Sequence, residues 1–322
     1  MKGELFGALN LNMLESTQEE RYKLLRLNID SENGLRKIAK SIENPLIEYV
    51  ERESLARRLL RVDPLPSASL VMYNFPVGSY YSQGKKFFVL GEGHMKIGVS
   101  IDNKPYYEDS VEITEDIESV RRFSDKLYYL YSCVASGETC LLFNMIRDYI
   151  GKTPAACYTY EKFTMNTLYE MVERVDPDRR GSQVINGMIV GEQEFEKIAK
   201  DVNFDIHTRP SASFVGTLYG ISVYLRKGLK DTIYFLPSLN ELGVIIENIQ
   251  DTSLPVDRRA FNVECTRNGN EIKISICQTF GMIMDPTGIY AMKFNIEKEI
   301  KKETKNDFNR YTALTKVEKW RS

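Results

Sequence analysis

The sequence predicts an α+β protein, because helical and strand patterns occupy separate stretches of its 322 residues. Apolar residues recur at helical spacing from Val120 to Tyr149. Strand-like runs, separated by glycine and asparagine turns, fill the stretch from Leu70 to Ile113 before that helix. A mixed α/β region follows it and ends in a hairpin. Apolar residues make up 43% of the chain and charged residues 27%, which is typical of a globular protein with a buried core.

The first sixty residues predict three short helices. Thr17 and Glu20 have the spacing of a capping box, and Ser31 is expected to cap a second helix. Asn44-Pro45 is expected to end that helix, since the residue before proline avoids helical angles. The proline would then begin a third helix that runs through Leu59. Short charged helices bury little among themselves, so we expect an arm that packs on something else.

The strand-like stretch from Leu70 to Ile113 predicts an extended hairpin that projects from a body, because it offers little local core for its length. The helix behind it would be about 45 Å long at ~1.5 Å per residue. Gly151 is a candidate C-cap for this helix, and Gly137 is a candidate interruption. Thr164 has the flanking apolar residues of a further helix start.

Beyond Arg180 the pattern predicts alternating strands and helices. A strand is expected at 184–190, a short helix around Phe195 and Ile198, and a strand from Ile221 to Leu225. A final hairpin is expected between 261 and 276, with Asn268-Gly269 as a type I′ turn.

No set of residues predicts catalysis, a cofactor or a metal site. The chain has only two histidines, His94 and His207, and lacks both a Walker lysine motif and a His-Glu-x-x-His motif. The segment Gly91–His94 lacks the third glycine and the following helix of a phosphate-binding loop, so we expect a hairpin turn there. The five cysteines are odd in number and form no close pair, which favours reduced thiols. We therefore expect a protein that is not an enzyme.

The charge balance argues against a protein that grips nucleic acid, because the formal net charge is -2 and basic pairs lie among acids. These pairs are interpreted as solvated helix faces and intersubunit ion pairs. The 19 tyrosines include adjacent pairs suited to interfaces. No apolar run reaches the ~20 residues of a membrane span, and no signal peptide is evident, so we expect assembly in the cytoplasm. The candidate intersubunit residues are Tyr80, Tyr81, Lys85, Lys86, Arg57, Arg58, Arg121 and Arg122.

Four stretches, taken in order, carry a resemblance to a known family. They are Ser54–Pro66, Asn186–Ala199, Gly216–Val223 and Lys273–Met292. The expected elements follow one another in the order arm, hairpin, long helix, mixed unit and returning hairpin. With these four stretches and this order of elements, the chain resembles the Hong Kong 97-like capsid fold of tailed-bacteriophage major capsid proteins. The resemblance covers nearly the whole chain.

This resemblance implies a division of the chain into named parts. These are an N-terminal helical arm (1–66), an extended loop (67–113), a peripheral domain with its spine helix (114–184), an axial domain (185–258), peripheral return strands (259–296) and a C-terminal tail (297–322). It implies a major capsid protein that assembles into pentamers and hexamers of an icosahedral or prolate head around double-stranded DNA. Some relatives crosslink a loop lysine. Lys85 and Lys86 fall in the loop, but no partner asparagine or glutamate is assignable, so no crosslink is predicted.

The partners implied are further copies of the chain, a portal, possibly a decoration protein and a separate scaffolding protein, since no long acidic helical extension precedes the arm. Packaged DNA would be touched only weakly, and no membrane is involved. The expected location is the virion. Two alternatives stay open: an encapsulin-type nanocompartment shell, which shares the fold, and an α/β hydrolase or transferase with an unrecognised site.

Overall fold

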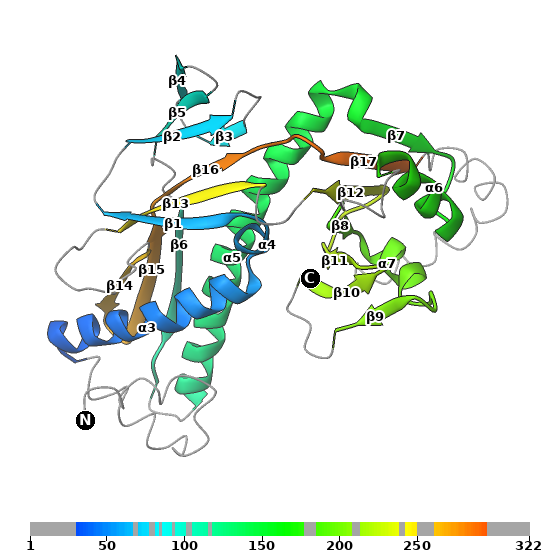
Figure 1. Cartoon of the computed structure of the whole chain (residues 1–322). Coiled ribbons are helices and arrows are strands. Elements are labelled where there is room, and N and C mark those ends of the chain that lie inside the picture. Colours follow the sequence, from blue (N-terminus) through cyan, green and yellow to red (C-terminus); the bar gives the residue numbers. More distant parts are fainter. Residues whose placement is uncertain are drawn as a thin grey trace, which may run out of the picture. The chain divides into compact units, whose positions relative to one another are not determined.

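A computed structural model describes residues 30–66, 70–76, 81–83, 86–91, 94–100, 105–114, 118–176, 185–207, 213–237, 242–249 and 261–294, with the backbone alone described in 64–100 and at 248–249. It confirms the predicted α+β class, because helices and mainly antiparallel strands form separate layers. The chain divides into two compact units (Figure 1). The first is Met1–Tyr149 with Leu239–Thr287, and the second is Ile150–Ser238 with Gly288–Ser322.

Helix α3 (Glu32–Glu53) begins where the sequence predicts, because the Ser31 hydroxyl oxygen accepts a hydrogen bond from the Gly34 amide at 3.0 Å. The prediction that Pro45 ends this helix is wrong: α3 runs through the proline. Residues on both sides of it, Ile42 and Leu46, lie in one buried stripe, and burial of the continuous stripe outweighs the lost backbone hydrogen bond. The short helix α4 (Leu55–Leu59) follows. The predicted helix at Thr17 lies outside the described residues.

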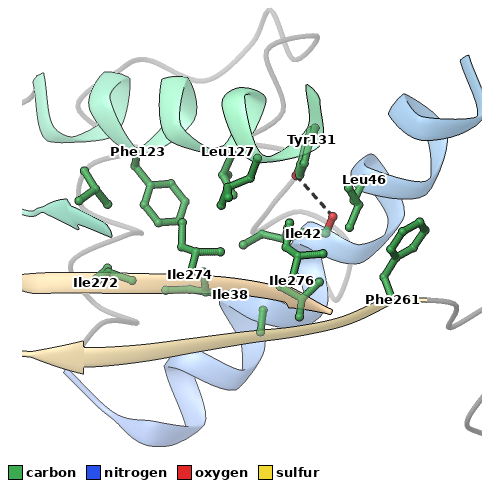
Figure 2. Close-up of a cluster of buried hydrophobic side chains, with 14 of the residues drawn as sticks. Ile38, Ile42, Leu46, Phe123, Leu127, Tyr131, Phe261, Ile272, Ile274 and Ile276 are labelled. Atoms are coloured by element: carbon green, nitrogen blue, oxygen red, sulfur yellow. Dashed lines mark hydrogen bonds between the residues drawn. The ribbon is translucent and has the colours of Figure 1, made fainter. Parts of the chain in front are cut away.

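The core of the first unit lies between a three-stranded antiparallel sheet and the helices α3 and α5. The sheet order is β14 (Phe261–Asn268), β15 (Glu271–Gln278) and β6 (Tyr106–Glu112). Every second residue along β15 is buried. The buried isoleucines of this strand, Ile272, Ile274 and Ile276, pack with Phe123 and Leu127 of α5 and with Ile38 and Ile42 of α3 (Figure 2). The two helices also touch, since the Tyr131 hydroxyl donates to the Ile42 carbonyl oxygen at 3.4 Å.

The long helix α5 (Glu118–Lys152) is confirmed as one element of 35 residues. Gly137 does not interrupt it. The helix ends one residue beyond the predicted cap Gly151. In the final hairpin, Asn268 faces Glu271, so the two-residue turn is Gly269-Asn270, one residue later than predicted. A type I′ turn requires positive φ at both central residues, but of these two only Gly269 has it, at 62°. The predicted type I′ turn is therefore wrong, and glycine in the first central position fits a type II′ turn.

The predicted loop hairpin at 67–113 is only partly correct. Strands β2 (Leu70–Pro76), β5 (His94–Ser100) and β4 (Lys86–Gly91) form a small sheet of their own. However, β6 belongs to the core sheet of the first unit, because Val111 lies opposite Ile272 and is buried with it. A further sheet has the order β1 (Arg61–Pro66), β13 (Gly243–Ile249), β16 (Phe280–Met284) and β3 (Tyr81–Gln83).

The second unit is a seven-stranded mixed sheet. Its order is β7 (Cys157–Tyr160), β17 (Tyr290–Phe294), β12 (Thr232–Leu236), β8 (Gly187–Val190), β11 (Ile221–Leu225), β10 (Phe214–Leu218) and β9 (Phe204–Ile206). Residues of α6 (Met165–Val175) pack on it, as does Ile198 of α7 (Glu192–Ile198), and the short 3₁₀ helix Pro154–Ala156 precedes β7. The predicted start of α6 is confirmed, since Thr164 forms a capping box with Thr167.

The two units cut across the predicted boundaries. The division implied by the resemblance assigns helix α6 to the peripheral domain, but the buried residues of α6 pack on the sheet of the second unit. Strand β13 was placed in the axial domain, but it pairs with β1 and β16 of the first unit. Strand β17 was placed among the peripheral return strands, but it pairs with β12 and β7. The chain therefore passes between the units three times, at about 150, 239 and 288.

Candidate functional site

Four of the candidate intersubunit residues fall in the predicted extended loop, where little is described. Tyr80 and Lys85 lie outside the described residues, and Tyr81 and Lys86 begin β3 and β4 with their side chains undescribed. Their role at an interface remains a prediction.

Three candidate arginines are exposed, and the hydrogen bonds and ion pairs described for them join them to residues nearby in the chain. Arg58 donates to the Arg52 carbonyl oxygen at 3.1 and 3.2 Å, and Arg121 lies 3.8 Å from Glu118. Arg122 donates to the Thr114 hydroxyl at 2.7 Å. Exposed pairs of this kind contribute little to stability, about 0–1 kcal/mol. The role of these three arginines at an interface between copies of the chain stays a prediction.

The prediction for Arg57 is wrong. Its side chain is only 3% exposed, so it is neither a solvated residue nor available to another copy of the chain. Arg57 instead forms ion pairs with Glu138 of α5 and Glu247 of β13, and its guanidinium lies 5.6 Å from the Phe261 ring centre. No local pattern predicts these ion pairs, because the two acids lie 81 and 190 positions away along the chain.

The buried charge cluster, defined as Arg57, Glu138, Glu247 and Gln278, joins four elements of the first unit. Arg57 Nε donates to both oxygens of Glu138, at 2.9 and 3.1 Å, and its terminal nitrogen donates to Glu138 at 2.7 Å and to Glu247. The Gln278 amide also donates to Glu138. Neither acid is exposed by more than 2%. One guanidinium thus faces two carboxylates away from water, an arrangement that costs free energy unless a further charge or proton balances it.

The described residues offer no set suited to catalysis or to metal binding. His207 stacks edge-on against Phe214, with ring centres 5.0 Å apart, and no group of three or more His, Cys, Asp or Glu could hold a metal there. One pocket of about 470 Å³, with several charged residues in its lining, lies beside the start of α5. Its Arg122 already bonds Thr114, and its Lys126 pairs with Asp109 at 2.9 Å. Across the described ranges, no helix is both long and apolar enough to cross a bilayer.

The most exposed apolar side chains of the described chain lie at one edge of the second unit's sheet. Val202 is 95% exposed and Ile206 is 72% exposed, and Tyr219 is also exposed in the turn after β10. The Asn203 amide donates to the Tyr219 hydroxyl, which places the tyrosine beside the start of β9. We call Val202, Ile206 and Tyr219 the β9 edge patch. None was predicted, because a three-residue strand carries almost no periodic signal.

The backbone of β9 is partly open to a further strand. The His207 amide donates to the Val215 carbonyl oxygen of β10 at 3.1 Å. Successive residues of an antiparallel strand direct their backbone groups alternately to opposite sides, so the backbone groups of Ile206 point away from β10. Among the described strands, β9 is the last of its sheet. An open edge with exposed apolar side chains is a surface on which another chain can add.

The core sheet of the first unit has a second open edge. Strand β6 pairs only with β15 among the described strands. Among the described residues of this unit, the exposed aromatic side chains are Tyr106, on this strand, and Tyr129, on α5. Tyrosine is enriched at protein interfaces because it combines apolar area with a polar tip.

The proteins similar to this chain are found among solved structures. No protein-family model matches it, and no curated protein matches its sequence. Among solved structures, it is similar to the mature capsid of bacteriophage PhiM1, with 12% identity over 76% of this chain and 87% of that one, at a TM-score of 0.44. It is similar to the procapsid of satellite phage P4, with 12% identity over 78% of this chain and 97% of that one, at a TM-score of 0.42.

Most of the solved structures similar to this chain are phage capsids. An encapsulin of Synechococcus elongatus is similar as well, with 11% identity over 74% of this chain and 87% of that one, at a TM-score of 0.39. At these identities and scores, the likeness by itself assigns no function. The function must therefore be argued from the contacts and surfaces of the chain.

Proposed function

We propose that this chain is the major capsid protein of a tailed bacteriophage, a shell subunit without catalytic activity. Copies would form pentamers and hexamers of a head that encloses double-stranded DNA, assembled in the host cytoplasm with a portal and a separate scaffolding protein. The observation that carries the proposal is the architecture itself. An arm helix and a 35-residue helix share one core with a returning hairpin, and the chain passes three times between two units. This is the order of elements that the resemblance implies.

The open sheet edges support the proposal. A soluble monomer usually protects its edge strands with charges, bulges or covering segments. In contrast, β9 carries one of the most exposed apolar side chains of the described residues, Ile206, and β6 has Tyr106 on it. Contacts between unlike edges of neighbouring copies are heterologous, and heterologous contacts close into rings when the rotation allows it. Pentamers and hexamers are such rings.

The charges are consistent with a shell that encloses DNA without gripping it. The face of the core sheet turned away from the helices carries four acids and one lysine, namely Glu108, Glu112, Glu264, Glu271 and Lys273. A surface that binds phosphates would need the opposite balance. Any contact with packaged DNA would therefore be weak and non-specific.

Sedimentation velocity of the full-length chain, followed by negative-stain electron microscopy, tests the proposal. We expect capsomer-sized rings or closed shells whose fraction grows with protein concentration. A monomer or dimer at every concentration would contradict the proposal. Shells that co-purify with one protein cargo instead of requiring a scaffold would favour an encapsulin-type compartment.

A second experiment tests the role of the loop strands. Deletion of residues 80–93 removes β3 and β4 but none of the residues of the two buried cores described above. We expect a folded chain, by circular dichroism and thermal melting, that no longer forms closed shells. Normal particles from the deleted chain would show that the loop is not an intersubunit element.

A further inference from the structure

The buried charge cluster has one positive group for two acids. Arg57, Glu138 and Glu247 have side chains exposed by 3%, 0% and 2%. If both acids were ionised, the cluster would hold a net negative charge in the interior of the first unit. An unbalanced buried charge is far more costly than a paired one, and a protein usually avoids it by binding a proton.

The hydrogen bonds distinguish the two acids. Glu138 accepts from two nitrogens of Arg57 and from the Gln278 amide, so three nitrogens donate to its oxygens. Glu247 accepts only from Arg57 among the hydrogen bonds described. The poorer set of donors at Glu247 makes it the acid that gains most from a proton.

An unpaired acceptor lies in the same cluster. The side-chain oxygen of Gln278 is buried and has no hydrogen-bond partner in the described residues. The other end of that amide donates to Glu138, so the oxygen lies among the same charged groups. A carboxyl with a proton is a donor, whereas a carboxylate is only an acceptor. A cluster with one surplus acceptor therefore favours one protonated acid.

We infer that Glu247 carries a proton in the folded chain near neutral pH and that loss of this proton weakens the junction of α4, α5 and β13. This inference does not depend on the proposed shell function, because it concerns the stability of the first unit alone. The cluster lies where the N-terminal helices join the strand β1, since α4 ends at Leu59 and β1 begins at Arg61. The proton on Glu247 would therefore make the stability of the contacts among α4, α5 and β13 depend on pH.

The surroundings of Glu247 agree with this inference. Burial raises the pKa of Glu247, the positive charge of Arg57 lowers it in part, and the charges of Glu138 and Glu51 raise it further. The strands on either side place Pro64 and Phe280 opposite Glu247, and neither residue titrates. Tyr107 of β6 lies near Glu138, and its pKa is raised to about 12 by burial and by that acid, so it remains neutral at ordinary pH.

The sign of the effect follows from the direction of this shift. Because the pKa of Glu247 is higher in the folded chain than in the unfolded chain, its stabilising contribution is complete at low pH. The contribution is lost as the pH rises from the unfolded pKa through the folded one. Over that interval, the unfolding equilibrium constant should rise by up to about tenfold per pH unit from this one group.

The test is Glu247→Gln in the full-length chain, with Glu48→Gln on the exposed face of α3 as the matched control. Glutamine has the shape of a protonated glutamate and cannot ionise. We expect the Glu247→Gln variant to lose the increase in the unfolding constant with rising pH that the parent and Glu48→Gln both show in urea titrations between the unfolded and folded pKa of Glu247. The infrared carbonyl band of a protonated carboxyl should also disappear in Glu247→Gln and persist in Glu48→Gln.

Two outcomes would overturn the inference. One is a pH dependence and an infrared band that are the same in the parent and in Glu247→Gln. The other is a Glu247→Gln variant that fails to fold, because a glutamine that copies the neutral acid would then not be tolerated in its place. Glu138→Gln gives a second reading. This variant leaves a single acid for Arg57, so its stability should fall less with rising pH than that of the parent.

Discussion

The hydroxyl of Tyr107 occupies the place where residue 137 of the long helix would carry a side chain. A Cβ built on Gly137 would lie 2.0 Å from the Tyr107 hydroxyl oxygen. The glycine thus lets β6 approach α5 closely, and this explains why a residue that weakens helices lies near the middle of α5 without interrupting it.

Gly137→Ala should destabilise the chain although alanine is the better helix former. At an open helix site the exchange gains up to ~1 kcal/mol, but here the clash with Tyr107 should cost ~1–3 kcal/mol. Gly151→Ala is the matched control, because nothing lies within 4 Å of its Cβ position. Urea unfolding should show a loss for the first variant and no loss for the second. The double variant Gly137→Ala with Tyr107→Phe should recover part of the loss, and no recovery would mean that the hydroxyl is not the obstacle.

Arg57→Met should destabilise the first unit strongly. Removal of one partner from a buried ion pair leaves its acids without compensation, and the usual cost is ~3–5 kcal/mol. Arg58→Met, one residue along the same helix, removes an exposed side chain and should change stability by less than ~0.5 kcal/mol. Chemical denaturation of both variants measures the difference. Equal effects at the two positions would contradict the burial of Arg57.

The five cysteines should differ in reactivity. Burial raises the pKa of Cys265 to about 12, so its thiolate is scarce at pH 8, whereas Cys140 is exposed on α5. With a thiol reagent at pH 8, Cys140 should react early and Cys265 last in the native chain, while all five should react after denaturation. Peptide mapping of the labelled protein gives the order. Early labelling of Cys265 in native protein would contradict its placement in the core.

Local signals predicted the elements that depend on neighbouring residues. The caps at Ser31 and Thr164, the existence of the long helix α5 and that of the final hairpin follow from the spacing of residues within a few positions. The continuity of α5 through Gly137 and the exact turn of the hairpin did not follow from such signals. Long-range pairing lies beyond such signals. The continuous α3 depends on burial of its stripe against a core that includes β14, more than 200 residues later in the chain, and that burial overrides the local effect of Pro45.

The candidate surfaces show the same limit. The sequence shows the basic pairs only as neighbouring charges. The fold is what distinguishes the buried Arg57 from the exposed Arg58. The β9 edge patch could not be predicted, because Val202 and Ile206 look like ordinary core residues in the sequence. Their exposure is a consequence of the place of β9 at the end of the strand order.

The most direct test of the account is self-assembly through the β9 edge patch. Ile206→Lys with Val202→Lys adds two charges to exposed positions, so the chain should keep its fold and its melting temperature. A single Glu173→Lys on the exposed face of α6 serves as the control. Sedimentation velocity should show large assemblies for the parent and the control, and only small species for the double variant. Large assemblies from the folded double variant would remove β9 from the interface, and their absence from the parent would contradict the proposed shell itself.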